Sequence, residues 1–164
     1  QQAEQAWYVV LVDGKPHGEA AALAMLLTER HPDAGLAPPL GSAQRADFLQ
    51  WMFYLANTLQ PQFRQWFFPG DHLPEAAETI KQAARIGIEK CWAYIDAHLA
   101  QHGPHLLGAQ HGLVDFYALM LMRWSRNMPK PATNWPQLAA LASALKARPS
   151  WKRLYELEGL TEWP

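Results

Sequence analysis

The side chains with the clearest chemical potential are four histidines that fall within 14 residues, namely His98, His102, His105 and His111. His98 and His102 have the i, i+4 spacing that places two imidazoles on one helix face. Zinc needs deprotonated ligands in tetrahedral geometry, usually completed by cysteine or carboxylate. The pair Gly103-Pro104 also interrupts a helix between these histidines. We therefore expect solvent-exposed histidines and no metal site.

A second group of residues could hold an apolar small molecule. An aromatic run begins at Trp51 and ends at Phe68, and Arg64 would offer a polar group within it. Most small-molecule sites combine apolar walls with a few polar groups, although most of these rings are expected to fill the core. If a pocket forms, we predict that it is lined by Trp51, Tyr54, Asn57 and Trp124.

The cysteine and serine side chains are not predicted to act as catalytic nucleophiles. Cys91 is the only cysteine, which excludes an internal disulfide and a CxxC motif and fits a reducing compartment. Its helical neighbours predict that it fills the core. Ser42 and Ser125 lack a nearby histidine and acid in a recognisable order, so serine hydrolase chemistry is not supported.

The bulk properties exclude several classes of protein. Hydrophobic residues make up 49% and charged residues 18% of the 164 residues, which is typical of a globular chain with one well-buried core. The net charge is -1 and the basic residues are scattered, so there is no basic stripe for nucleic acid. The longest apolar run, residues 20–27, is too short to cross a bilayer. We predict a cytoplasmic protein.

The elements that position these residues begin with a short β segment. Residues from Trp7 to Val12 are β-branched and aromatic, and they stop at the tight-turn signal Asp13-Gly14. Lys15-Pro16-His17 predicts a short second edge strand, because proline cannot donate to the ladder. A strong helix-forming run follows, from Glu19 to Leu27.

Beyond a linker rich in proline and glycine, the sequence predicts helices only. Apolar spacing of three and four residues predicts helices over 43–68, 74–102, 113–124, 135–147 and 150–158. Pro61 predicts a kink or break in the first of them. The helix over 113–124 is apolar on nearly every side, so it is expected at the centre of the domain.

Three segments in this order resemble the glutathione-transferase superfamily of bacterial type. Residues 11–23 are similar to its last two thioredoxin-like strands and the acidic-serine turn that follows. Leu106-Leu107-Gly108 with Leu113-Val114-Asp115 resembles the capping motif before its buried sixth helix, and Ala147-Arg148-Pro149-Ser150 resembles a helix-ending signature. The resemblance implies a mainly α fold: a partial thioredoxin-like ββα segment (1–32), a linker (33–42) and the family's C-terminal helical bundle (43–164).

The capping motif has a physical meaning of its own. A buried helix start leaves four backbone N–H groups without partners, and the charge of Asp115 suits the positive end of a helix. The family usually has Ser or Thr at the cap position, where this sequence has Gly112, so only half of a capping box is present. We assign Gly112 and Asp115 a structural role.

The resemblance also implies a partial glutathione site. Glu19 matches the acidic residue of the family's acidic-serine pair, and Ala20 replaces the serine, although its amide at a helix start could still bind an anion. Tyr8 stands where the family has its cis-proline. The family's thiol-activating Tyr, Ser or Cys would lie earlier in the chain, and only six residues stand before Trp7. We therefore expect a truncated glutathione transferase without a catalytic residue, whose enzymatic status is uncertain.

The implied activity is transfer of glutathione to small apolar electrophiles, impaired or absent in this form, with glutathione as a possible substrate and no cofactor. The alternative is a noncatalytic ligand-binding or protein-interaction module, and the chain could equally be a fragment of a longer enzyme. The unpaired edge of the strand from Trp7 to Val12 would seek a partner. It predicts a homodimer through that strand.

Overall fold

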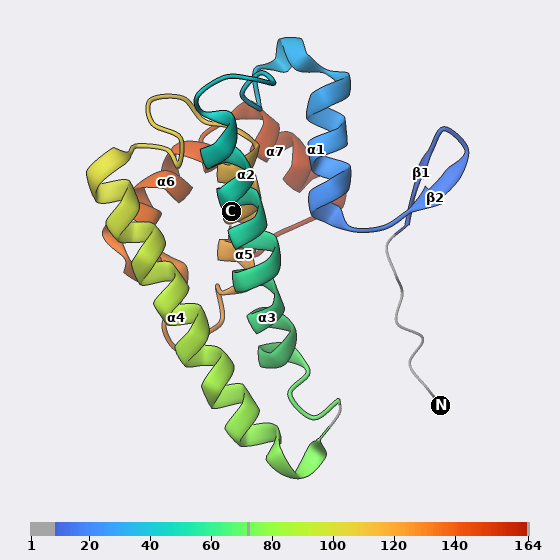
Figure 1. The fold of residues 1–164 in the computed structure, drawn as a ribbon. Helices are drawn as coiled ribbons and strands as arrows, with labels where there is room; N and C mark the ends of the chain where they lie inside the picture. The colour runs from blue at the N-terminus through green and yellow to red at the C-terminus, as the bar shows by residue number, and fades with distance from the viewer. Residues whose placement is uncertain (1–8, 72, 164) are drawn as a thin grey trace.

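The computed structural model describes residues 9–71 and 73–163, and in this part of the chain a small β-hairpin precedes a bundle of helices (Figure 1). Strands β1 (Val10–Val12) and β2 (Lys15–His17) are antiparallel, with Leu11 opposite Pro16. Asp13 and Gly14 turn the chain with φ of 51° and 77°, the left-handed pair that an Asp-Gly turn favours. The predicted hairpin is confirmed here, whereas Trp7 and Tyr8 lie outside the described residues.

The hairpin stands away from the bundle, and helix α1 (Ala20–Arg30) connects it to the remaining helices (Figure 1). The predicted helix is confirmed, and α1 packs against the central helix α5 (Leu113–Trp124) through Ala21 and Met25, which are part of the core rim. The linker that follows contains one short 3₁₀ turn, Pro32–Ala34.

The helices beyond the linker match the predicted ranges closely. They are α2 (Arg45–Phe53), η2 (Tyr54–Leu59), α3 (Gln60–Phe67), α4 (Ala77–His102), α5, α6 (Pro136–Lys146) and α7 (Pro149–Glu158), with 3₁₀ turns η3 (Pro74–Ala76) and η4 (Ala132–Asn134). Gly159 ends α7 in the left-handed conformation, with φ of 59°. Helices α3 and α4 lie side by side and run in opposite directions (Figure 1).

Of the kink or break predicted at Pro61, the structure shows a helical irregularity and no break. The helix continues through Pro61, and the irregularity lies just before it, where η2 is a π-helical segment. There the amide of Gln60 donates to the carbonyl of Leu55, five residues back. In a regular α-helix the Pro61 ring would clash with the carbonyl of Asn57, four residues earlier. The wider π turn relieves this clash without ending the helix.

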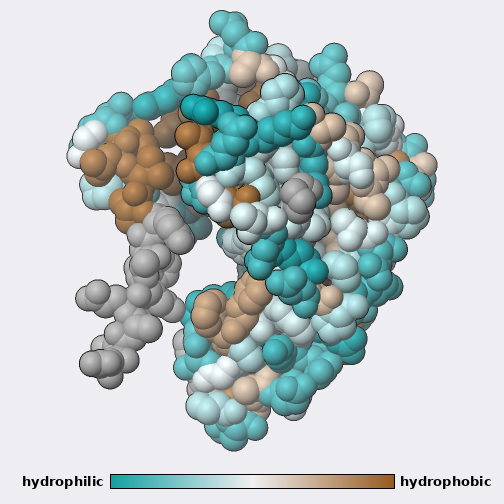
Figure 2. All heavy atoms as spheres, turned by 180° about the vertical axis from the view of Figure 1, so that it is seen from behind, coloured by the Kyte–Doolittle hydropathy of each residue, from teal (hydrophilic) through white to brown (hydrophobic). Residues whose placement is uncertain are grey.

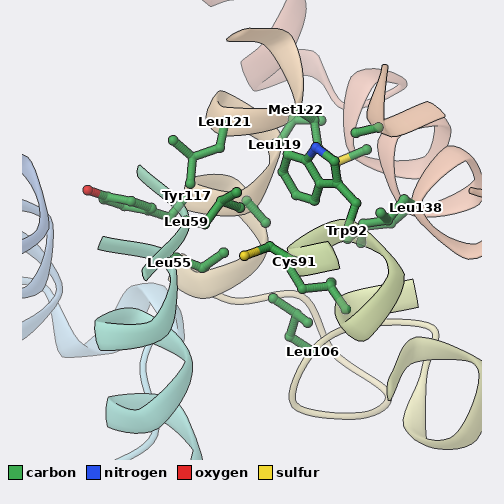
Figure 3. Close-up of a cluster of buried hydrophobic side chains, with 14 of the residues drawn as sticks. Leu55, Leu59, Cys91, Trp92, Leu106, Tyr117, Leu119, Leu121, Met122 and Leu138 are labelled. Atoms are coloured by element: carbon green, nitrogen blue, oxygen red, sulfur yellow. The ribbon is translucent and has the colours of Figure 1, made fainter. Parts of the chain in front are cut away.

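The core is built on α5, as the sequence predicts. Seven of its residues are buried, and it contacts α1, α2 and α6. Figure 3 shows the Trp92 side chain lying among Leu119, Met122 and Leu138, with the Cys91 sulfur pointing towards α2 and η2. Trp92 is fully buried. Full burial of rings of this size is a large part of the stabilisation of the bundle.

Among the residues that the structure describes, no helix is both long and apolar enough to cross a membrane.

Candidate functional site

The first part of the candidate site is the start of α1. Glu19 precedes the helix with φ of 61° and ψ of 93°, a conformation that a residue with a side chain adopts only at a cost. Leu23 donates to the carbonyl of Glu19 as the first helical hydrogen bond. The amides of Ala20 and its two neighbours therefore have no helical partner. Glu19 and Ala20 are exposed, so these amides face a surface where an anion could bind.

Tyr117 on α5 links this helix start to the bundle. Its ring is buried and its hydroxyl donates a hydrogen bond to Oε1 of Gln60. Burial raises the pKa of Tyr117, and the charge of Glu19 raises it further. Tyr117 therefore remains a protonated donor.

Gln60 lines a hollow of about 600 Å³, the α3/α5 pocket. It is lined by Ala56, Gln60, Pro61, Arg64, Phe67, Phe68, Trp124 and Arg126. Both arginines are held by carboxylates, Arg64 by Asp71 at 2.6 Å and Arg126 by Glu162 at 2.7 Å. Aromatic walls with a few fixed polar groups are the usual composition of a site for an apolar small molecule.

The four residues predicted to line a pocket do not share one hollow. Trp124 lines the α3/α5 pocket, whereas Trp51 is buried and lines a different hollow between α2 and α4. Tyr54 packs edge-on against Trp51, with ring centroids 5.6 Å apart, and Asn57 is exposed. The structure thus brings Trp51 and Tyr54 together and separates them from Trp124. Their role in substrate binding stays a prediction.

Sequence reasoning missed Gln60 and Tyr117 as site residues. A signal for the first was present, because residues 56, 60 and 64 follow one another at four-residue spacing and so share a helix face. Tyr117 gave no such signal, because its neighbours on α5 are apolar on all sides. A hydroxyl buried in that environment needs an acceptor, and Gln60 supplies it.

The start of α5 is held by Asp115, whose carboxylate is fully buried. It accepts hydrogen bonds from the amide of Gly112 at 2.8 Å and from the amide of Leu106 at 2.9 Å. Burial raises the pKa of Asp115, and these two bonds oppose that rise. The carboxylate therefore joins the helix start to the preceding loop, which is a structural role.

Gly112 fits this arrangement because it has no side chain. A Cβ at this position would lie 3.0 Å from the carbonyl oxygen of Leu36 in the linker, closer than most real contacts. That carbonyl instead accepts a hydrogen bond from the amide of Leu113. A backbone group of the linker thus caps α5 in the place of a Ser or Thr side chain.

The histidines are less exposed than predicted. Only His102 is exposed, whereas the other three are half-buried. His98 Nε2 lies 2.9 Å from the carbonyl oxygen of Leu106, and the rings of His98 and His102 are 4.7 Å apart. The expectation of solvent exposure is therefore wrong for three of the four, because the loop after α4 folds back over their rings.

Cys91 lies in the core, as predicted. Burial raises the pKa of its thiol, while a hydrogen bond with Tyr54 opposes the rise. The thiolate is the nucleophilic form of cysteine, so this environment disfavours reactivity.

Comparison with known proteins gives a consistent set of neighbours. No protein-family model matches the chain. It is 28% identical over 127 residues to the uncharacterised GST-like protein YncG of Escherichia coli K12, a match that spans 77% of this chain and 60% of YncG. The chain thus covers less than two thirds of that relative.

Solved structures agree with this relationship. A ternary complex of BphK, a bacterial GST, superposes with a TM-score of 0.82 at 25% identity, covering 93% of this chain and 74% of BphK. A sphingomonad glutathione S-transferase complexed with glutathione superposes with a TM-score of 0.80 at 25% identity and the same coverage.

Proposed function

Because its sequence and structural neighbours place this chain in the glutathione-transferase superfamily, we propose that it is a glutathione-transferase-like protein with a site for glutathione at the start of α1 and a site for an apolar electrophile in the α3/α5 pocket. The activity of the superfamily would be transfer of glutathione to that electrophile: the glutathione sulfur loses its proton and forms a bond to the electrophilic carbon, and the leaving group of the electrophile departs. Glutathione is a substrate in this proposal, and no cofactor is required.

One observation carries the proposal: α5 packs against α1, and its Tyr117 donates a hydrogen bond to Gln60 in the α3/α5 pocket. The exposed amides at Ala20 suit a carboxylate of glutathione, and the α3/α5 pocket offers Trp124 and other rings to an apolar partner. The sphingomonad neighbour, which has the same fold over this region, is described with bound glutathione. Two substrates bound on either side of Tyr117 would be close to each other, as a transfer reaction requires.

We further propose that conjugation by this chain is weak or absent. Activation of glutathione needs a donor that favours thiolate over thiol at the sulfur. Among the described residues we identify none with that role near Glu19. Tyr117 does not qualify, because its hydroxyl already donates to Gln60 and burial raises its pKa.

Calorimetric titration with glutathione, beside a conjugation assay with chlorodinitrobenzene, tests this function. The sphingomonad enzyme serves as the active reference. We expect measurable glutathione binding with little turnover. Binding by Glu19→Gln should be weaker, because the variant loses the carboxylate that can pair with the ammonium group of glutathione, with Glu29→Gln as a matched control on the same helix. Absence of binding would contradict the glutathione site. Turnover comparable to the reference would contradict the proposed loss of activation.

The exposed hairpin favours the alternative, an interaction module. Val10 and Leu11 are 50% and 70% exposed, and apolar side chains gather on the hairpin in Figure 2. Within the described residues, β1 pairs only with β2, so its other edge is open for pairing. We propose a homodimer in which this strand, predicted from Trp7 to Val12, pairs with its symmetry mate.

Light scattering after size-exclusion chromatography tests the dimer. We expect a dimer at micromolar concentration and a monomer for Leu11→Lys, with Leu27→Lys as a control on another exposed surface. A monomeric wild-type protein would contradict the proposal. The single buried cysteine further supports a reducing compartment, and we propose the cytoplasm.

A further inference from the structure

The hollow that Trp51 lines, the α2/α4 hollow, lies where α2 begins and α4 ends. Its volume is about 510 Å³, and it shares no lining residue with the α3/α5 pocket. Side chains at three- and four-residue spacing share one face of a helix. Two such rows line the hollow, namely Gln44, Asp47 and Trp51 at the start of α2, and Tyr94, His98 and His102 on α4.

Aromatic rings form part of the wall. The ring of Trp51 lies 4.6 Å from that of His98 and 5.7 Å from that of Tyr94, measured between centroids. Trp51 is buried, whereas half of Tyr94 is exposed. An exposed ring that is held against other rings offers a fixed surface for a flat apolar group, and aromatic faces attract cations.

The loop after α4 binds donor atoms of two polar side chains in this hollow. Nε2 of Gln44 donates to the carbonyl of Leu107 at 3.0 Å, which leaves Oε1 of the same amide as an acceptor. Nε2 of His98 lies 2.9 Å from the carbonyl oxygen of Leu106. A carbonyl can only accept, so this nitrogen carries the proton, and Nδ1 of the neutral ring is an acceptor. Both side chains therefore suit a ligand that donates hydrogen bonds.

Asp47 gives the hollow a negative charge. Its side chain is exposed. Within residues 9–71 and 73–163 it forms no salt bridge, and no lysine or arginine among them lines the hollow. The positive end of α2 and the negative end of α4 lie at the same place and offset each other. The carboxylate therefore determines that a cation is favoured here.

We propose that the α2/α4 hollow binds an organic ammonium ion with a flat apolar body. The ammonium group donates hydrogen bonds to the carboxylate of Asp47 and to Oε1 of Gln44, and the apolar body lies against the exposed ring of Tyr94. A hydrogen bond between an ammonium and a carboxylate is stronger than one between neutral groups. The site is separate from the proposed glutathione and electrophile sites and does not depend on them.

Calorimetric titration of the unmodified protein with 2-phenylethylamine and 2-phenylethanol tests the proposal. The two compounds have the same ring and linker, and only the amine is charged at pH 8, where free imidazole is largely neutral. We expect the dissociation constant of the amine to be about tenfold lower than that of the alcohol. The anionic analogue phenylacetate should bind more weakly than either. Equal binding of amine and alcohol would overturn the proposal, and so would absence of amine binding.

Substitutions locate the site. Asp47→Asn removes the proposed partner of the ammonium group, and Asp33→Asn is the control at an exposed aspartate outside the hollow. Tyr94→Ala removes the exposed ring, and Phe53→Ala is the control at an exposed ring that does not line the hollow. We expect amine binding to weaken about tenfold in Asp47→Asn and about threefold in Tyr94→Ala, and to be unchanged in both controls. An equal loss in Asp33→Asn would contradict the assignment.

The ratio of amine to alcohol binding separates loss of charge from loss of structure. In Asp47→Asn the preference for the amine should disappear while the alcohol binds as it does to the wild type, a result that general unfolding cannot give. A preference that persists in this variant would refute the role of its carboxylate. The comparison of amine with alcohol on the unmodified protein needs no variant, so the proposal stays falsifiable if a variant does not fold.

Discussion

The backbone amide of Leu113 donates a 2.7 Å hydrogen bond to the carbonyl of Leu36. A linker that separates the ββα segment from the bundle in sequence thus supplies a cap for the central helix. The contact depends on Gly112, whose missing side chain leaves room for that carbonyl. Linker and core helix are therefore expected to lose stability together.

Substitution of Gly112 tests this contact. In Gly112→Ala the new Cβ would crowd the Leu36 carbonyl at 3.0 Å, so we expect a loss of about 1 kcal/mol in the free energy of unfolding. Urea denaturation measures it. The control is Gly70→Ala, where the nearest atom would lie at an ordinary 3.6 Å. Equal effects of the two substitutions would contradict the proposed crowding.

Removal of the Asp115 carboxylate should be more costly. Asp115→Ala leaves the amides of Gly112 and Leu106 without their acceptor, and we expect a loss of about 3 kcal/mol. Asp115→Asn keeps one acceptor oxygen and should lose less. The comparison uses urea unfolding of the three proteins. A ranking in which Asn is as damaging as Ala would show that the charge, rather than the hydrogen bonds, matters.

His111 should make stability depend on pH. Burial lowers its pKa, and the charges of Arg148 and His105 lower it further. Between the lowered folded pKa and the ordinary value of about 6.5, the unfolded chain binds more protons than the folded protein. Stability contributed by neutral His111 is thus present above about pH 6.5 and is lost as the pH falls through that window.

The measurement is the urea midpoint between pH 8 and pH 5. His111→Gln should flatten the acid side of the profile, whereas the exposed control His102→Gln should leave it as in the wild type. Identical slopes for the wild type and His111→Gln would rule out this source of pH dependence.

Cys91 should be protected from thiol reagents. Burial raises its pKa and denies access to the sulfur, so reaction with Ellman's reagent at pH 8 should be about a hundredfold slower in the folded protein than in denaturant. In native buffer, the rate at which the Cys91 thiol reacts should be set by how often the bundle opens locally. Immediate reaction of one thiol per chain would mean that the sulfur is accessible.

Much of the fold follows from local signals in the sequence. Asp13-Gly14 predicts its turn because few residue pairs tolerate two consecutive positive φ angles. The bundle helices follow from apolar spacing, and α5 is recognisable as central because it is apolar on nearly every side. These signals lie within a few residues of one another, and no knowledge of tertiary contacts is needed to use them.

The candidate site is less predictable because its geometry is not local. The contact between Tyr117 and Gln60 joins residues 57 positions apart, and the Leu36 carbonyl leaves no trace in the sequence because it is a backbone group. The grouping of Trp51 with Trp124 rested on residue type, which does not fix where the side chains lie in space. The structure places the two residues in different hollows.

The π turn over residues 54–59 also constrains how this chain can change. A π turn holds one residue more than the α-helical turn that it replaces, so deletion of one residue within it would restore a regular α-helix and leave the later side chains of α3 on the same faces. Gln60 would still face Tyr117, but a proline at the following position would lose the room made for it. A relative with one residue fewer here should therefore have a different residue in place of Pro61.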